Sequence, residues 1–270
     1  MNYDLLIVRY GEIGTKGQNR GFFEKRLADN VKDCLEKNKT PYSKIIWPKG
    51  RLLIEGVDAP KAAKTLRRVF GIVSTSPALV TGTDLESLNK AADSLAENAK
   101  LGPKKTFKIE ARRNDKTTPL NSIQMNHLVG EHVLEKFKCR VDVHEPDLTI
   151  YIETLQGKAL LFTEKVPGFG GLPLGIEGAV ECTAATKGDA LACWMLMKRG
   201  CWPALKGKGA YKKVIDAFSY GKPVESRPLA TVSGKAPAKK KGKQVTFHPL
   251  VGLGKKEKEA LWKAAMEALK

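Results

Sequence analysis

Residues 5–20 read LLIVRYGEIGTKGQNR, a stretch in which a strand gives way to a helix and from which the rest of the fold can be worked out. The unbroken apolar run at 5–8 is typical of a buried strand, and we predict a strand over residues 3–9. Apolar side chains then recur at near-helical spacing, which predicts a helix from about Asn19 to Asn38. Three glycines between the two elements let the backbone approach a ligand, although an ordinary strand-to-helix connection fits them equally well.

The residues that follow predict a ferredoxin-like unit. Four further elements are expected: strands at 43–47 and 51–56 around the turn Pro48-Lys49-Gly50, a helix at 59–69 and a strand at 72–79. The order strand, helix, strand, strand, helix, strand is the split βαβ arrangement. Residues 1–80 are therefore predicted to form an N-terminal ferredoxin-like domain.

A second α+β unit is predicted over residues 81–166. Its expected elements are helices at 84–99 and 121–136, the latter capped by Asn121 or Ser122, and strands at 106–112, 141–143, 148–153 and 158–163. The segment PGFGGLPLG at 167–175 then predicts a domain boundary, built as a hinge or as a close-packed loop.

The remaining residues, 176–270, are predicted to form a small α/β unit. Its expected elements are strands at 179–183 and 245–251 and helices at 189–199, 211–218 and 255–269. The fold class predicted for the whole chain is therefore α+β followed by α/β.

The net charge points to a polyanionic partner. The chain of 270 residues carries a formal charge of +18, which favours nucleic acid over a membrane surface. After Cys201 there are 16 basic and 5 acidic side chains, and Lys239, Lys240, Lys241 and Lys243 concentrate the excess in a basic loop at 235–243. The segment 236–242 is expected to be a solvated, flexible loop that adds unspecific affinity for phosphates without reading sequence.

Cysteine and histidine spacing excludes several kinds of site. The five cysteines are Cys34, Cys139, Cys182, Cys193 and Cys201. Without a CxxC pair they indicate neither a disulfide framework nor a zinc site, and inert thiols in a reducing cytoplasm are expected. The four histidines show no catalytic or metal-binding spacing, so no metal is predicted. No apolar stretch of 18 residues and no secretory signal are present, so we expect no membrane partner and a cytoplasmic location.

Two motifs carry a resemblance to a known family. The pattern R-Y-G-E-I-x-x-K-G-x-N-R at 9–20, followed by two aromatic residues and Glu24, resembles the N-terminal signature of the tRNA 4-thiouridine synthetases, or tRNA sulfurtransferases. The segment KTFKIEARRNDK at 105–116 resembles the central strand and loop of a THUMP domain, an RNA-binding module. The resemblance covers residues 1–201 and implies that residues 81–166 are a THUMP domain.

The resemblance also implies a partner, namely the acceptor end of tRNA. The residues expected to contact RNA are Arg9, Tyr10, Lys16, Asn19, Arg20, Arg112, Arg113 and Lys116. Arginine is suited to phosphate because its guanidinium donates two parallel hydrogen bonds. Without the resemblance, the charged end of the strand at 106–112 would be interpreted as solvated surface.

In the same family a phosphate loop of pattern S-G-G-x-D-S opens a helix and binds ATP. The positions that correspond to it here are Ala184, Ala185, Thr186, Lys187, Gly188 and Asp189. Serine and both adjacent glycines are replaced, and the added Cβ atoms block a close backbone approach to phosphate. We therefore predict a truncated, degenerate PP-loop domain, no catalytic residues and no cofactor, with ATP and magnesium bound only if this loop still accepts nucleotide.

Three functions remain open from the sequence. The first is a tRNA-binding protein related to the 4-thiouridine synthetases, with an inactive ATP loop. The second is a minimal tRNA uridine thiolation enzyme that works with a separate sulfur donor or catalytic partner protein. The third is a basic protein associated with ribosomal RNA.

Overall fold

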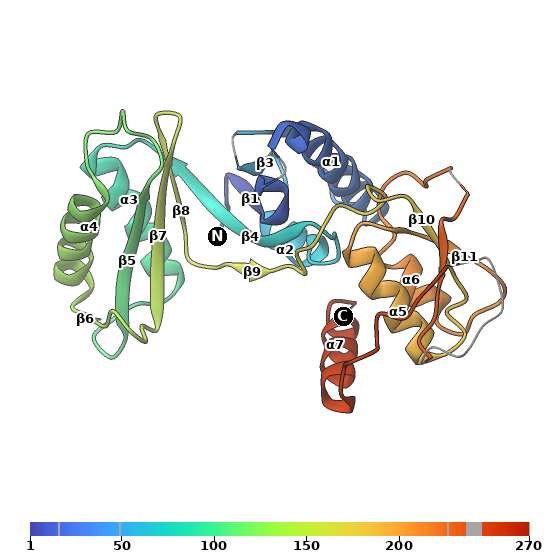
Figure 1. Ribbon diagram of the computed structural model, residues 1–270. Helices are drawn as coiled ribbons and strands as arrows, with labels where there is room; N and C mark the ends of the chain where they lie inside the picture. Colours follow the sequence, from blue (N-terminus) through green and yellow to red (C-terminus); the bar gives the residue numbers. More distant parts are fainter. Residues whose placement is uncertain (16, 49, 226, 236–244, 270) are drawn as a thin grey trace.

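The computed structural model describes residues 1–15, 17–48, 50–225, 227–235 and 245–269. The predictions for Lys16, Lys49, the segment 236–242 and the lysines at 239–243 lie outside these residues. A nine-stranded sheet in the order β2-β3-β1-β4-β8-β7-β5-β6, with β9 beside β4, runs through the first two thirds of the chain. A separate four-stranded sheet forms the last third, at the opposite end of the molecule from α4 (Figure 1).

The N-terminal part has the predicted ferredoxin-like order. Its elements are β1 (Leu5–Tyr10), η1 (Glu12–Thr15), η2 (Gly17–Asn19), α1 (Arg20–Lys37), β2 (Lys44–Ile46), β3 (Arg51–Glu55), α2 (Ala59–Leu66) and β4 (Ile72–Thr81). Strand β1 pairs antiparallel with β3 and β4, and Leu6 and Val8 on its helix side pack with Leu27 and Val31 of α1. The two short 3-10 turns between β1 and α1 were not predicted.

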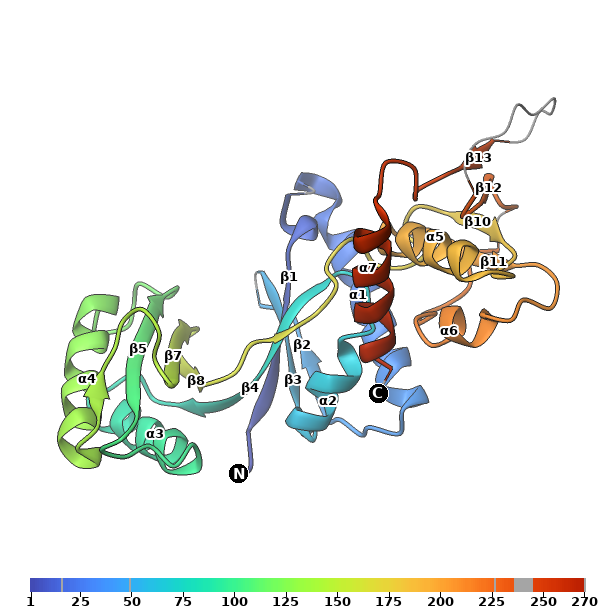
Figure 2. The same ribbon diagram turned by 90° about the horizontal axis from the view of Figure 1, so that it is seen from below.

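The second part uses the same sheet. Its elements are α3 (Leu85–Asn98), β5 (Thr106–Arg113), α4 (Ser122–Phe137), β6 (Arg140–Val141), β7 (Leu148–Leu155) and β8 (Lys158–Phe162). The long strand β4 pairs with β1 at one end and with β8 at the other, so the two halves share a continuous framework. Figure 2 shows β4 running from one half into the other. Strand β6 is shorter than predicted because the Asp142 carboxylate accepts hydrogen bonds from the backbone of His144 and Glu145 and turns the chain.

The glycine-rich segment at 167–175 is the close-packed loop of the two alternatives. Strand β9 (Val166–Pro167), which was not predicted, pairs with β4. A Cβ added to Gly171, whose φ is +79°, would lie 2.1 Å from the carbonyl oxygen of Lys198. Glycine is needed here because the chain bends and touches another backbone at the same point.

The C-terminal unit is a small parallel α/β structure. Its elements are β10 (Ala179–Cys182), α5 (Lys187–Lys198), β11 (Trp202–Leu205), α6 (Lys212–Asp216), β12 (Ala230–Val232), β13 (Thr246–Phe247) and α7 (Lys255–Glu267). The sheet order is β11-β10-β12-β13. Strands β11 and β12 were missed because they are short and carry no alternating pattern. The strand predicted at 245–251 ends at Phe247, two residues before Pro249, which lacks the N–H that a strand ladder needs.

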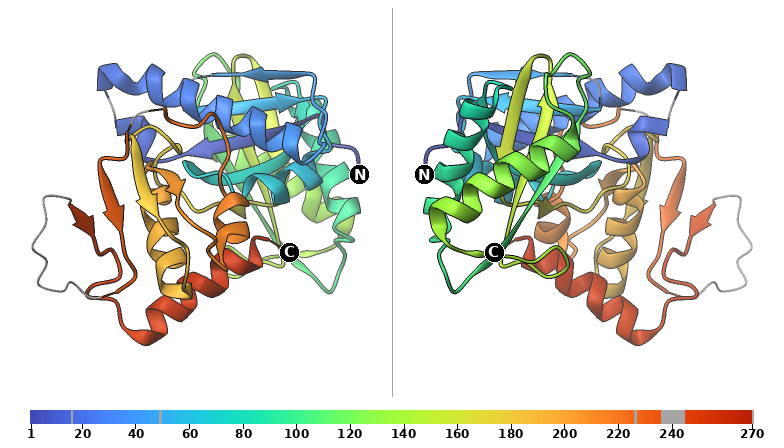
Figure 3. Two further views of the ribbon diagram at one scale, coloured as in Figure 1. Left: turned by 90° about the vertical axis from the view of Figure 1, so that its right-hand side faces the viewer. Right: turned by 90° about the vertical axis from the view of Figure 1, so that its left-hand side faces the viewer.

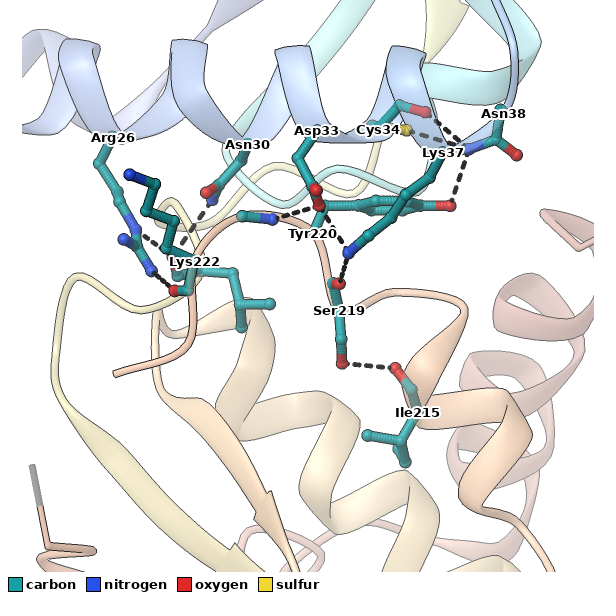
Figure 4. Close-up of polar contacts among 12 residues, drawn as sticks. Arg26, Asn30, Asp33, Cys34, Lys37, Asn38, Ile215, Ser219, Tyr220 and Lys222 are labelled. Carbon is teal, nitrogen blue, oxygen red and sulfur yellow. Dashed lines mark hydrogen bonds and ion pairs between the residues drawn. The ribbon is translucent and has the colours of Figure 1, made fainter. Parts of the chain in front are cut away.

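This C-terminal unit is docked on one face of α1. Arg26 and Asn30 donate to the carbonyl oxygen of Leu174 at 2.7 and 3.1 Å, and the backbone N–H of Gly221 donates to Asp33 at 2.7 Å (Figure 4). Lys37 completes the row by donating to the carbonyl oxygen of Ser219. Positions 26, 30, 33 and 37 share one helix face, so a single stripe of α1 holds both Leu174 and the segment 219–222, to which Arg26 also donates at the carbonyl oxygen of Lys222.

Candidate nucleic-acid interface and the loop before α5

Arg9 connects the two halves of the nine-stranded sheet. Its guanidinium lies 3.0 Å from a carboxylate oxygen of Glu153 on β7, donates to Ser76 Oγ at 2.9 Å and sits 4.7 Å from the ring centre of Phe162. Arg51 of β3, which is paired in register with Arg9, binds the other oxygen of Glu153. Burial raises the pKa of Glu153, but the two arginines outweigh that effect and leave its pKa below the usual value.

The side chains of Tyr10 and Arg20 are engaged in a hydrogen-bond network within the N-terminal part of the fold. Arg20 donates to Glu24 at 2.7 Å and to the Tyr10 hydroxyl at 3.2 Å, and that hydroxyl donates to Glu24. Burial, together with the Glu24 carboxylate, raises the pKa of Tyr10. This network fastens the start of α1 to the end of β1, whereas the neighbouring Asn19 is exposed.

The strand end at 112–116 does not present three equivalent cations. Alternation along β5 sends Arg112 and Arg113 to opposite faces of the sheet. The Arg112 side chain is 66% exposed, on the face not covered by α3 and α4. Arg113 instead donates to the carbonyl oxygens of Lys116 and Thr118 and holds the following turn together, with the Lys116 side chain exposed beside it.

Strand register brings Arg9 and Arg112 to one surface. Arg112 is the register partner of Glu153, the residue that Arg9 contacts. Sequence reasoning missed three other basic residues of this surface, Arg51, Lys108 and Lys165. The alternation in KIEAR at 108–112 was a signal for Lys108, but nothing local indicated Arg51 or Lys165.

The loop before α5 is closed by its own side chains. The Thr186 hydroxyl caps the helix by accepting a hydrogen bond from the backbone N–H of Asp189 at 3.1 Å. In return, the Asp189 carboxylate accepts hydrogen bonds from the backbone N–H and the hydroxyl of Thr186. It also accepts a hydrogen bond from the backbone N–H of Gly234 at 3.1 Å. Burial raises the pKa of Asp189, but these hydrogen bonds outweigh it, and the pKa lies below its usual value. The reciprocal cap also explains why α5 begins at Lys187 and not at Asp189 as predicted.

Neighbouring loops pack closely against both sides of this segment. Ala184 is buried with φ +46°, a conformation that favours glycine. A Cβ on Gly209 would lie 2.2 Å from the Thr183 carbonyl oxygen, and one on Gly234 would lie 2.1 Å from the carbonyl carbon of Gly188. The backbone of other loops therefore fills the space around the start of α5.

Lys187 is engaged by the last helix of the chain. Its Nζ lies 2.7 Å from a carboxylate oxygen of Glu259 and 5.5 Å from the ring centre of Trp262, both on α7. Helix α7 crosses the N-terminal end of α5 (Figure 3). The cation nearest the helix start is thus already neutralised by an acidic side chain.

The cysteines are free thiols, as predicted, and Cys201 alone is half-buried. Burial raises the pKa of Cys34 to about 12 and also raises the pKa values of Cys139 and Cys201. A hydrogen bond with Cys182, together with burial, raises the pKa of Cys193. Within the residues that the structure describes, no three His, Cys, Asp or Glu side chains are grouped to hold a metal ion, and no helix is long and apolar enough to cross a membrane.

Comparison with known protein families identifies both halves of the long sheet. Residues 5–76 match the ThiI ferredoxin-like domain, and residues 82–164 match the THUMP domain. The fold and this surface therefore define a THUMP-domain protein with a ferredoxin-like domain in front. The chain is therefore related to the tRNA sulfurtransferases, or 4-thiouridine synthetases, which confirms the resemblance found in the sequence.

Individual relatives show how far the similarity extends. The chain is 38% identical over 203 residues to a probable tRNA sulfurtransferase of Thermococcus kodakarensis, covering 73% of this chain and 53% of the relative. For the corresponding protein of Natranaerobius thermophilus the values are 36% over 208 residues, 73% and 50%. The chain thus spans about half the length of the curated relatives it matches.

Two solved structures share the fold. PH1313 from Pyrococcus horikoshii has 30% identity and a TM-score of 0.83, with 97% of this chain and 99% of that chain covered. A 4-thiouridine synthetase solved with RNA and ATP has 24% identity and a TM-score of 0.76, with coverage of 99% and 85%. The second similarity concerns the fold alone.

Proposed function

We propose that this chain binds the acceptor end of tRNA with the sheet face shared by its ferredoxin-like and THUMP domains, and that its ATP loop is inactive. The observation that carries the first part is the sheet register, in which Arg112 lies opposite Glu153, the residue that Arg9 contacts, because it brings basic residues of the two domains to the same sheet face. The relationship to the tRNA sulfurtransferases and a net charge of +18 support the same partner.

The inactive loop is supported by the anion that already occupies the start of α5. A phosphate would need the backbone N–H groups there, but the Asp189 carboxylate accepts from Thr186 and Gly234. A triphosphate would have to displace this carboxylate and the Gly234 backbone and would meet Lys187 already paired with Glu259. We therefore expect no uridine adenylation by this chain alone.

The thiols support a separate sulfur donor for any thiolation in which the chain takes part. A sulfur carrier needs a thiolate, and the raised pKa values of Cys34, Cys139, Cys193 and Cys201 disfavour one. The names of the curated relatives favour the minimal thiolation enzyme as the second candidate. In that case the donor would be another protein or sulfide.

A reconstituted assay separates these functions. The purified chain is incubated with ATP-magnesium, tRNA and sulfide, and AMP, pyrophosphate and 4-thiouridine are measured. We expect tRNA binding without turnover. Robust tRNA-dependent turnover that is abolished by Lys187→Ala or Asp189→Ala would establish the minimal enzyme, and equal competition by ribosomal RNA fragments would favour a ribosomal role.

A further inference from the structure

Three cations surround a single carboxylate on the open face of the THUMP half. Glu110 of β5 lies 3.7 Å from Lys108 Nζ, 3.5 Å from Arg112 and 3.7 Å from Lys165 Nζ. These separations exceed those of close charge-assisted hydrogen bonds, and the Glu110 side chain is 33% exposed. Within the described part of the chain, Glu110 is the ion-pair partner that these three cations share, so the group of four side chains carries a net charge of +2.

Aromatic packing holds Lys165 in this group. Its Nζ lies 3.5 Å from the ring centre of Tyr151, and that ring stacks on Phe162 at 5.0 Å. Desolvation lowers the pKa of Lys165 and repulsion by Arg112 and Arg9 lowers it further, whereas attraction by Glu110 and Glu153 opposes the change. The ammonium group is thus fixed beside like charges, an arrangement that an added anion would stabilise.

We propose that Lys108, Arg112 and Lys165, here called the phosphate cluster, bind a backbone phosphate of single-stranded RNA, and that Glu110 weakens this binding. Phosphate oxygens suit the Arg112 guanidinium and the ammonium groups of Lys108 and Lys165, which lie around Glu110 with it. Glu110 keeps the cations together without RNA and repels a phosphate that enters between them. The proposal rests on the proposed RNA-binding function and assigns it a contact point that includes Lys165, just before β9.

The substitution Glu110→Gln gives the sharpest test, because removing the competing negative charge should tighten RNA binding. With a 5′-labelled single-stranded acceptor-tail RNA at low salt, Glu110→Gln should raise the affinity about fivefold, the effect of one like charge about 4 Å away in water. Lys108→Ala, Arg112→Ala and Lys165→Ala should each weaken binding and flatten the slope of log K against log salt by about 0.7.

An ion pair on α3 supplies matched controls. Glu86 and Lys90 lie 2.6 Å apart, and their side chains are 77% and 75% exposed on the helix-covered side of the sheet. Glu86→Gln and Lys90→Ala change the same charges and should leave affinity within about twofold. If Glu110→Gln and the three alanine variants behave like these controls while the wild type binds RNA, the cluster assignment is wrong and the proposed function stands.

Lysine acetylation read by mass spectrometry gives an independent measurement. RNA should protect Lys108 and Lys165, but not Lys90, and inorganic tripolyphosphate should do the same in a parallel arm. If the wild type binds no RNA, the proposed function fails, and lysine protection by tripolyphosphate then tests whether the phosphate cluster binds phosphate at all. Protection by tripolyphosphate would then support a polyphosphate site, whereas unprotected lysines would overturn the assignment.

Discussion

At the scale of single residues, Glu153 is a nearly buried carboxylate that balances the charge of two arginines. Its side chain is 7% exposed and is shared by Arg9 and Arg51, whose side chains are 18% and 14% exposed. Glu153→Gln would leave two nearly buried guanidinium groups without a counter-charge, and we expect it to lower the free energy of unfolding by about 3 kcal/mol. Urea unfolding followed by circular dichroism measures this change.

The control for this variant is Glu131→Gln on α4, whose carboxylate is 58% exposed beside His127. It should change the free energy of unfolding by no more than about 0.5 kcal/mol. Equal effects of the two substitutions would show that the Arg9–Glu153–Arg51 contact contributes no more to stability than a surface pair.

The same carboxylate predicts a dependence of stability on pH. The pKa of Glu153 is lower in the folded chain than its ordinary value of 4.5, so the unfolded chain binds protons more readily. Its contribution is complete above that ordinary value and is lost as pH falls through the lowered folded pKa. Unfolding measured between neutrality and mild acid should therefore show a weaker acid dependence for Glu153→Gln than for the wild type, and parallel curves would contradict this.

At the scale of elements, the cap of α5 holds the loop that precedes this helix. Thr186→Ala removes the hydroxyl that accepts from the Asp189 N–H and donates to its carboxylate. We expect a loss of about 1 kcal/mol in the free energy of unfolding, measured with urea. Thr186→Ser keeps the hydroxyl and should retain most of the stability, and an equal loss in both variants would show that the cap is not the cause.

Elements differed in how well the sequence predicted them. Helix α4 has an apolar stripe and an Asn121 cap, and both signals are local, so it was predicted to within a residue at each end. Strand β9 was missed because its two residues form a strand only by pairing with β4. The turns η1 and η2 were missed for another reason: the three glycines between β1 and α1 permit many backbone paths, so the sequence does not specify one.

At the scale of the whole molecule, the stripe of α1 fixes the C-terminal unit. A Cβ on Gly221, whose φ is +104°, would lie 2.0 Å from the Asn30 side-chain oxygen. Gly221→Ala should therefore loosen this docking, raise the radius of gyration in small-angle X-ray scattering and speed proteolysis within 167–175. RNA affinity of the front domains should change by less than about twofold, because distant sites behave independently.

Gly252→Ala is the control for backbone strain at the whole-molecule scale. Gly252 has φ +88°, but nothing lies within 4 Å of an added Cβ. It should reproduce any general strain without the change in scattering. If both variants keep the wild-type radius of gyration, the stripe of α1 is not what holds the C-terminal unit in place.

The sequence by itself determined the order of the helices and the longer strands through residue 163 and the resemblance to the tRNA sulfurtransferases, because local spacing and contiguous motifs carry this information. Only the tertiary structure decided that Arg9 meets Glu153, that Lys165 joins Glu110, and that Asp189 is bound by Gly234. Those partners lie 144, 55 and 45 positions apart, so sheet register and loop packing bring them together, and no local pattern records it.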